Sequence, residues 1–92
     1  MLNIQRATTP HVVYSLSGRI EIEDVAELER LLSLENPAER LTLDLREVTL
    51  INRGAVKFLT RCEEGGARLE NCPGYIREWI EAEKNKNSRS QG

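Results

Sequence analysis

Residues 41–59 change from strand-like to helical periodicity within a few positions, and this change constrains the fold more than any other feature. Leu41, Leu43 and Leu45 alternate with polar residues, which is the period of a β-strand. From residue 55 onward the apolar positions follow helical spacing, at Ala55, Phe58, Leu59 and Cys62. The chain therefore contains a strand, a short loop over residues 46–54 and a helix in close succession.

The other periodic segments predict the element order β-β-α-β-α-β-α. Strands are expected at residues 2–6, 11–16, 41–45 and 67–71, and helices at 24–35, 55–64 and 73–83. Because a helix that joins two strands returns the chain to the same end of the sheet, the last three strands should be parallel. The first strand, joined by a hairpin, should form an antiparallel edge. We predict one small α/β domain over residues 1–83, with a four-stranded mixed sheet flanked by helices.

Length, charge and cysteine content exclude several classes of protein. The chain has 92 residues, which suffices for one core, and its net charge of −2 argues against nucleic-acid binding. We find no signal peptide and no apolar run near the roughly 20 residues that span a bilayer. The two cysteines do not make a secreted disulfide framework. We expect a cytoplasmic protein of bacterial type without membrane insertion, and a disordered polar tail at residues 84–92.

Few residues offer catalytic or metal-binding chemistry. His11 is the only histidine and is expected to be a partly exposed strand residue. The cysteines, Cys62 and Cys72, are not spaced for zinc or for a redox pair. We expect Asp44 to accept hydrogen bonds from loop amides, and Cys62 to lie in the core. The sequence therefore predicts a protein that is not an enzyme and needs no metal or cofactor.

The strand-to-helix loop is the expected binding surface. In a parallel sheet, sites form beyond the carboxyl ends of the strands, where residues 18–24, 46–54 and 71–74 should converge. Asn52 stands where a helix N-cap is expected, so free backbone N–H groups should face this surface. Acids prevail over residues 21–35 and bases over residues 53–68. These runs indicate solvated helix faces or steering toward a charged partner.

The chain resembles a STAS domain, the module found in anti-sigma factor antagonists and in the cytoplasmic tails of sulfate transporters. The resemblance covers roughly residues 12–80 and rests on residues 16–21 (LSGRIE), 44–52 (DLREVTLIN), 65–69 (GGARL) and 71–73 (NCP). It implies a mixed sheet flanked by helices. It also implies regulation by phosphorylation of a serine at the start of the second helix, where a phosphate adds about −1.5 to −2 charges.

The sequence departs from the family at the phosphorylation site. Asn52 stands where the family has aspartate, and Arg53 and Gly54 stand where it has two serines. The phosphoacceptor position falls on Gly54, and the nearest hydroxyls are those of Thr49 and Thr60. Glu21 also replaces a usual aspartate. We therefore expect a variant that is not switched by serine phosphorylation.

The resemblance implies a regulatory protein-binding module, and it leaves the partner open. An anti-sigma factor or another kinase-fold ATPase is the first expectation, which would place the protein in transcription regulation. A transporter ATPase served by an accessory subunit, a small ligand or anion held at the loop, and a homodimer are alternatives. A thiol enzyme or redox sensor that uses Cys72 is a further alternative. The expected partner-binding residues are Glu21, Asp24, Asn52, Arg53, Gly54 and Lys57.

Overall fold

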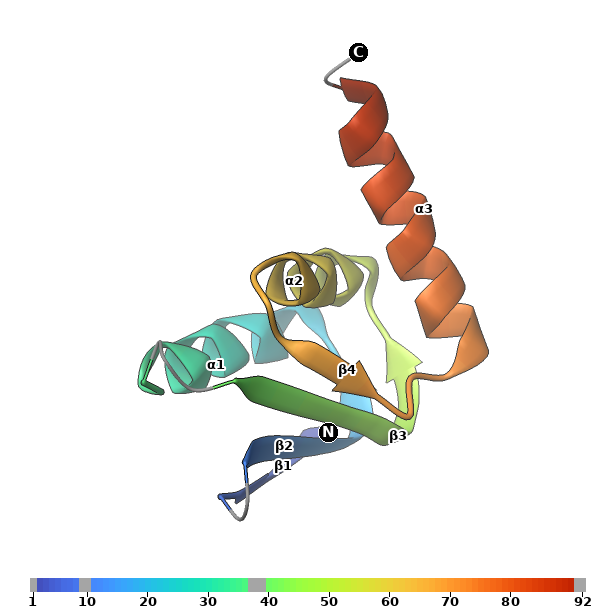
Figure 1. Ribbon diagram of the computed structural model, residues 1–92. Coiled ribbons are helices and arrows are strands. Elements are labelled where there is room, and N and C mark those ends of the chain that lie inside the picture. The colour runs from blue at the N-terminus through green and yellow to red at the C-terminus, as the bar shows by residue number, and fades with distance from the viewer. Residues whose placement is uncertain (1, 9–10, 37–39, 91–92) are drawn as a thin grey trace.

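The computed structural model describes residues 2–8, 11–36 and 40–90, and the backbone alone for residues 87–90. The element order is β-β-α-β-α-β-α, as predicted (Figure 1). The elements are β1 (Leu2–Ala7), β2 (Val12–Ile20), α1 (Ile22–Ser33), β3 (Leu41–Ile51), α2 (Arg53–Glu64), β4 (Arg68–Glu70) and α3 (Gly74–Ser90).

The four strands form one mixed sheet in the order β1-β2-β3-β4. β1 pairs antiparallel with β2, while β2–β3 and β3–β4 are parallel. The predicted fold class, the antiparallel edge strand and the parallel remainder are therefore confirmed. The parallel pairs follow from α1 and α2, since each of these helices carries the chain back across the sheet.

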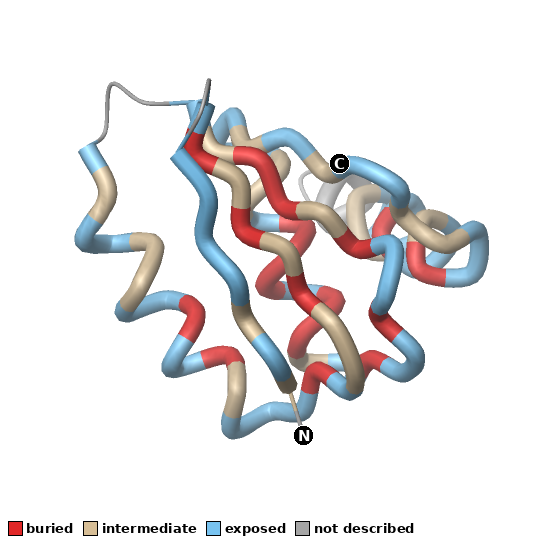
Figure 2. Tube along the Cα trace, turned by 90° about the horizontal axis from the view of Figure 1, so that it is seen from below, coloured by how far each residue is buried: buried red, intermediate tan, exposed pale blue. Residues whose placement is uncertain are grey.

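The helices α1 and α2 cover one face of the sheet, and α3 packs beside α2 (Figure 1). The other face is open and polar, with Gln5, Ser15 and Asp44 in register across three strands. Figure 2 looks at this open face and shows buried and less buried residues alternating along β2. The buried apolar residues are Val12, Tyr14, Leu16, Ile20, Val25, Leu28, Leu43, Leu45, Val48, Ile51, Ala55, Val56, Phe58, Leu59, Ile76 and Ile80.

The third strand is longer than its alternation predicts. β3 continues to Ile51, so most of the loop expected at residues 46–54 is strand. Asp44 pairs with Ser15 but Glu47 pairs with Ser17, which leaves one extra residue in β3. Such a bulge breaks the period of two, and strict alternation therefore misses the second half of the strand.

The second strand also continues past its predicted end at residue 16. β2 runs to Ile20, through Gly18 with a φ of 92°. A second register shift against β3 lies between Gly18 and Arg19. The extra residue at this shift lies in β3. Glycine permits the left-handed backbone conformation at little cost, so β2 continues through Gly18.

The first helix begins at Ile22, two residues before the predicted start. Asp24 is the third helical residue rather than the N-cap, and its carboxylate accepts a hydrogen bond of 2.9 Å from the backbone N–H of Glu21. The N-cap is Glu21. The helix was therefore predicted correctly from the sequence, but its start was placed two residues too late.

The third helix extends beyond the end predicted from its apolar residues. The segment expected to be disordered from Lys84 is helical to Ser90, and its last turns project beyond the other elements (Figure 1). Lys84 contacts Glu63 of α2 at 2.6 Å and Glu81 of α3 at 3.9 Å. These ion pairs stabilise the part of α3 that begins at Lys84, where the sequence has no apolar residue to bury. Residues 91–92 lie outside the described residues. None of the helices in the described ranges is long and apolar enough to cross a membrane.

Candidate functional site

The N-termini of α1 and α2 lie next to each other at the carboxyl ends of β2 and β3. Ile20 and Ile51 are paired across these strands, and the N–H of Asn52 donates to the carbonyl of Ile20 over 2.8 Å. Both helices therefore start at the same end of the sheet, where β2 and β3 end. We call this surface the rim and define it as Glu21, Ile22, Asn52, Arg53, Gly54 and Lys57.

Two predicted binding residues hold the helix starts in place. The Asn52 side chain accepts a hydrogen bond of 2.7 Å from the N–H of Gly54, which confirms the predicted N-cap. Asp24 bonds the backbone at Glu21, as described above. The side-chain oxygens that make these bonds set the position of the rim, and they are engaged within the chain.

The charged side chains of the rim are exposed. Glu21, Arg53 and Lys57 make no side-chain ion pair with another described residue, although the Glu21 carboxylate accepts a hydrogen bond from the backbone N–H of Asp24. Arg61 continues the row of bases one turn beyond Lys57 and is also exposed. The first turn of α2 contains no acid, so its bases lie near the positive end of the helix dipole without compensation.

An apolar side chain that sequence reasoning missed lies at the centre of the rim. Ile22 is 55% exposed and directly overlies Gly54. It borders a groove of about 380 Å³ that is also lined by Val25, Gly54, Lys57, Thr60, Arg61 and Glu83. The signal in the sequence was an isoleucine in the expected loop over residues 18–24, just before the predicted helix.

The third predicted loop does not reach the rim. β4 has three residues and pairs only with Thr42–Asp44, so its carboxyl end lies beside the first part of β3, seven residues before Ile51. The Asn71 side chain donates to Asp44 over 3.2 Å, and Asp44 also accepts from the N–H of Arg46 over 3.0 Å. Asp44 thus bonds backbone N–H, as predicted, although within the strand bulge. The convergence of all three loops was wrong because β4 is shorter than β3.

The helix α3 approaches the rim in place of that loop. The Tyr75 hydroxyl donates to the carbonyl of Thr49 over 3.3 Å, and Trp79 lies next to Arg53 and Val56 of α2. Trp79 falls within the helix predicted at residues 73–83, but only the tertiary structure brings it to Arg53.

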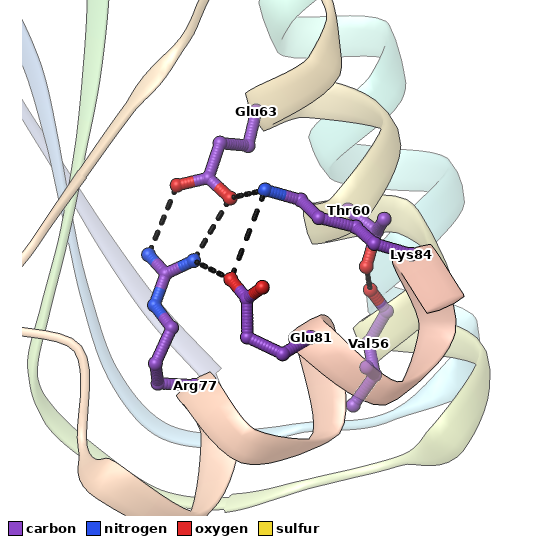
Figure 3. Close-up of polar contacts among 6 residues, drawn as sticks. All are labelled: Val56, Thr60, Glu63, Arg77, Glu81 and Lys84. Carbon is purple, nitrogen blue, oxygen red and sulfur yellow. Dashed lines mark hydrogen bonds and ion pairs between the residues drawn. The ribbon is translucent and has the colours of Figure 1, made fainter. Parts of the chain in front are cut away.

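A network of charges fixes α3 against the end of α2. Arg77 donates two hydrogen bonds of 2.9 Å to Glu63, and Lys84 donates one of 2.6 Å to the same carboxylate (Figure 3). Glu81 contacts Arg77 at 3.3 Å. The two cations, Arg77 first, lower the pKa of Glu63 to about 2. This carboxylate is therefore ionised at neutral pH and bridges the two helices.

The threonine hydroxyls and cysteine thiols considered above differ in their exposure to solvent. Thr60 is 1% exposed and its hydroxyl donates to the carbonyl of Val56 over 2.8 Å (Figure 3), whereas Thr49 is exposed. Burial raises the pKa of Cys62 to about 11 and raises the pKa of Cys72 as well. Burial thus favours the neutral thiol over the thiolate at both positions. Within the described ranges no three His, Cys, Asp or Glu side chains gather to hold a metal ion.

Comparisons with known proteins add a likeness of fold. No family model and no curated protein matches the sequence. The chain is similar to an uncharacterized protein of the DUF3478 family from Shewanella loihica PV-4, described as having a SpoIIAA-like fold, with 17% identity and a TM-score of 0.46. The similar region covers 75% of this chain and 60% of that one, so the chain spans about three fifths of that protein. The fold assignment here stands on the strand order and pairing of the chain itself.

Gly54 lets Ile22 lie directly over the start of α2. A Cβ atom at position 54 would clash with Ile22 Cδ1, and its next neighbour would be Asn52 Oδ1 at 3.2 Å. The clashing atom is the end of a flexible, exposed side chain, so it can move. We expect Gly54→Ser to change the free energy of unfolding by less than about 1 kcal/mol, because helix propensity favours serine over glycine.

A double-mutant cycle measures this contact. In an Ile22→Ala background the clash is gone, and Gly54→Ser is expected to stabilise the domain by a few tenths of a kcal/mol. Urea denaturation of the four proteins gives the coupling free energy, which should be about 0.5 kcal/mol or more. An identical effect of Gly54→Ser in both backgrounds would show that Ile22 does not restrict position 54.

Proposed function

We propose that this protein is a non-catalytic regulatory module that binds a protein partner through the rim. The single observation that carries the proposal is the exposed Ile22, which lies over Gly54 beside the exposed bases of α2 and follows the acidic Glu21. An apolar centre with a charged margin is the usual composition of a protein-binding surface. The groove beside Ile22 adds concave surface to it.

The rigid attachment of the rim also supports a binding role. The two helix starts are held by the Asn52 cap, by the Asp24 bond and by the link from Asn52 to Ile20. A surface that is already ordered loses little conformational entropy on binding. The rim can therefore act as a preformed template.

The partner that we propose is an anti-sigma factor or another kinase-fold ATPase. This proposal rests on the resemblance of the sequence to STAS domains. Position 54 carries no hydroxyl, so a serine switch at this point cannot operate and the complex should be constitutive. Arg53 then contributes a fixed positive charge to the contact.

The test is capture of the tagged protein from its native host, followed by titration of the purified partner. Arg53→Glu is expected to weaken the complex by about 30-fold or more, because it reverses a charge at the contact. ATP should leave the complex intact. The matched control is Arg40→Glu, a charge reversal just before β3, at the opposite end of the strand.

Each outcome of this test is informative. A tight complex that Arg53→Glu does not weaken would remove the rim from the binding surface. Dissociation by ATP would contradict a constitutive complex. Recovery of a transporter ATPase whose binding needs Arg53 would keep the binding surface and change the partner to that of the accessory-subunit alternative.

A further inference from the structure

Two aromatic side chains are exposed on α3, outside the rim. Trp79 is 46% exposed and Tyr75 is 39% exposed, and their rings meet edge to face with centroids 6.0 Å apart. They lie one helical turn apart on the same side of α3, and the Tyr75 hydroxyl is tied to Thr49. Tryptophan and tyrosine are the residues most enriched among those that dominate binding energy at protein interfaces.

Trp79 forms one wall of a small pocket between α2 and α3. The pocket has a volume of about 70 Å³ and is lined by Arg53, Val56, Trp79, Ala82, Glu83 and Lys86. Cofactor and drug-like ligands occupy pockets of roughly 300–1,000 Å³. This pocket is far smaller, and its size suits a single aliphatic side chain.

The charges at the pocket indicate the sign of its occupant. Arg53 and Lys86 are exposed at its edge and make no ion pair with other described residues, while Glu83 is the one acid in the lining. Lys57 and Arg61 extend the positive charge along α2. A partner segment with an aliphatic residue and acidic neighbours complements this arrangement, because the carboxylates of those neighbours would meet Arg53 and Lys86.

The pocket is held open by the packing of α3. Ile76 and Ile80 are fully buried, and the Glu63 network ties the opposite side of the helix to α2 (Figure 3). Trp79 is therefore displayed from a fixed backbone, which reduces the entropy lost when a partner binds.

We propose that this pocket, the Trp79 pocket, receives one aliphatic side chain of a partner protein segment whose neighbouring residues are acidic. The proposal rests on the proposed binding function and adds the chemistry of the segment that is bound. Arg53 belongs to both the rim and the Trp79 pocket, so one partner can contact both surfaces at once.

The experiment selects short random peptides displayed on phage against the folded protein. Trp79 is the only tryptophan in the chain, so its fluorescence reports directly on the pocket. We expect selected peptides to share an aliphatic residue flanked by Asp or Glu and to shift Trp79 emission saturably. Alanine in place of the aliphatic residue should abolish that shift.

Variants of the protein locate the peptide. Trp79→Ala and Arg53→Glu are each expected to weaken peptide binding by at least about tenfold. Binding to variants that lack Trp79 is measured calorimetrically. Ala82→Arg fills the pocket from an exposed position without removing a native contact, and it should have the same effect. Arg40→Glu should leave binding unchanged, and circular dichroism confirms that each variant is folded.

Several results would overturn the proposal. These are no enrichment of any peptide, enrichment of basic peptides, and binding that survives both Trp79→Ala and Ala82→Arg. The two proposals fail separately. A host partner that binds Trp79→Ala as tightly as wild type keeps the proposed function and removes the pocket. Peptide binding to the Trp79 pocket, with no host partner captured through the rim, would keep the pocket and remove the proposed function.

Discussion

Replacing Ile80 with alanine is expected to lower the free energy of unfolding by about 3 kcal/mol, within a usual range of about 2–5 kcal/mol. Ile80 has an exposed fraction of 0% and is part of the core where α3 packs on the domain. The loss combines the transfer free energy of the deleted atoms with the cost of the cavity that remains. Because small domains are stable by only about 5–15 kcal/mol, this is a large part of the total.

Urea denaturation followed by circular dichroism and by Trp79 fluorescence measures this effect. The matched control is Glu78→Ala, a truncation at an exposed position of the same helix, which should change stability by less than about 0.5 kcal/mol. Equal effects of the two substitutions would contradict the packing of α3 on the core. If α3 detaches locally, the fluorescence transition should precede the loss of helical signal.

Acid is expected to destabilise the domain between about pH 4.5 and pH 2 through two carboxylates. The pKa of Glu35 and that of Glu63 are both lowered from 4.5 to about 2. For Glu35 the main cause is Arg6, which donates hydrogen bonds of 2.7 and 3.0 Å, followed by the Tyr14 hydroxyl. For Glu63 the main cause is Arg77.

The sign of the effect follows from proton linkage. A carboxyl with a lowered pKa in the folded state takes up protons more readily when the chain unfolds. Its contribution to stability is complete above the unfolded pKa near 4.5 and is lost as the pH falls toward 2. The free energy of unfolding should therefore decrease steadily across this window.

Glutamine variants assign the pH dependence to its sources. Glu35→Gln and Glu63→Gln should each reduce the slope of stability against pH between about pH 4.5 and 2, and the double variant should reduce it further. The control is Glu78→Gln, an exposed residue with no ion pair among the described residues. A slope that neither single variant changes would rule out both networks as the origin of acid sensitivity.

The parts of the fold that local periodicity controls were predictable from the sequence. The element order, the antiparallel edge and the Asn52 cap depend on neighbouring residues and are all confirmed. The length of β3 could not be predicted, because its bulge exists only in the pairing with β2. The extent of α3 was also missed, since Lys84 is supported by a carboxylate 21 positions earlier in the chain.

The candidate site was also predictable from the sequence only in part. The sequence by itself determined that a strand-to-helix junction would present Asn52, Arg53 and Lys57, and that position 54 would lack a hydroxyl. Only the tertiary structure decided that Ile22 overlies Gly54 and that Trp79 borders Arg53. Residues within one element are positioned by backbone geometry over a few residues, whereas these contacts join elements far apart in sequence. Their positions are set by how α1 and α3 pack against α2, and no local sequence pattern predicts that packing.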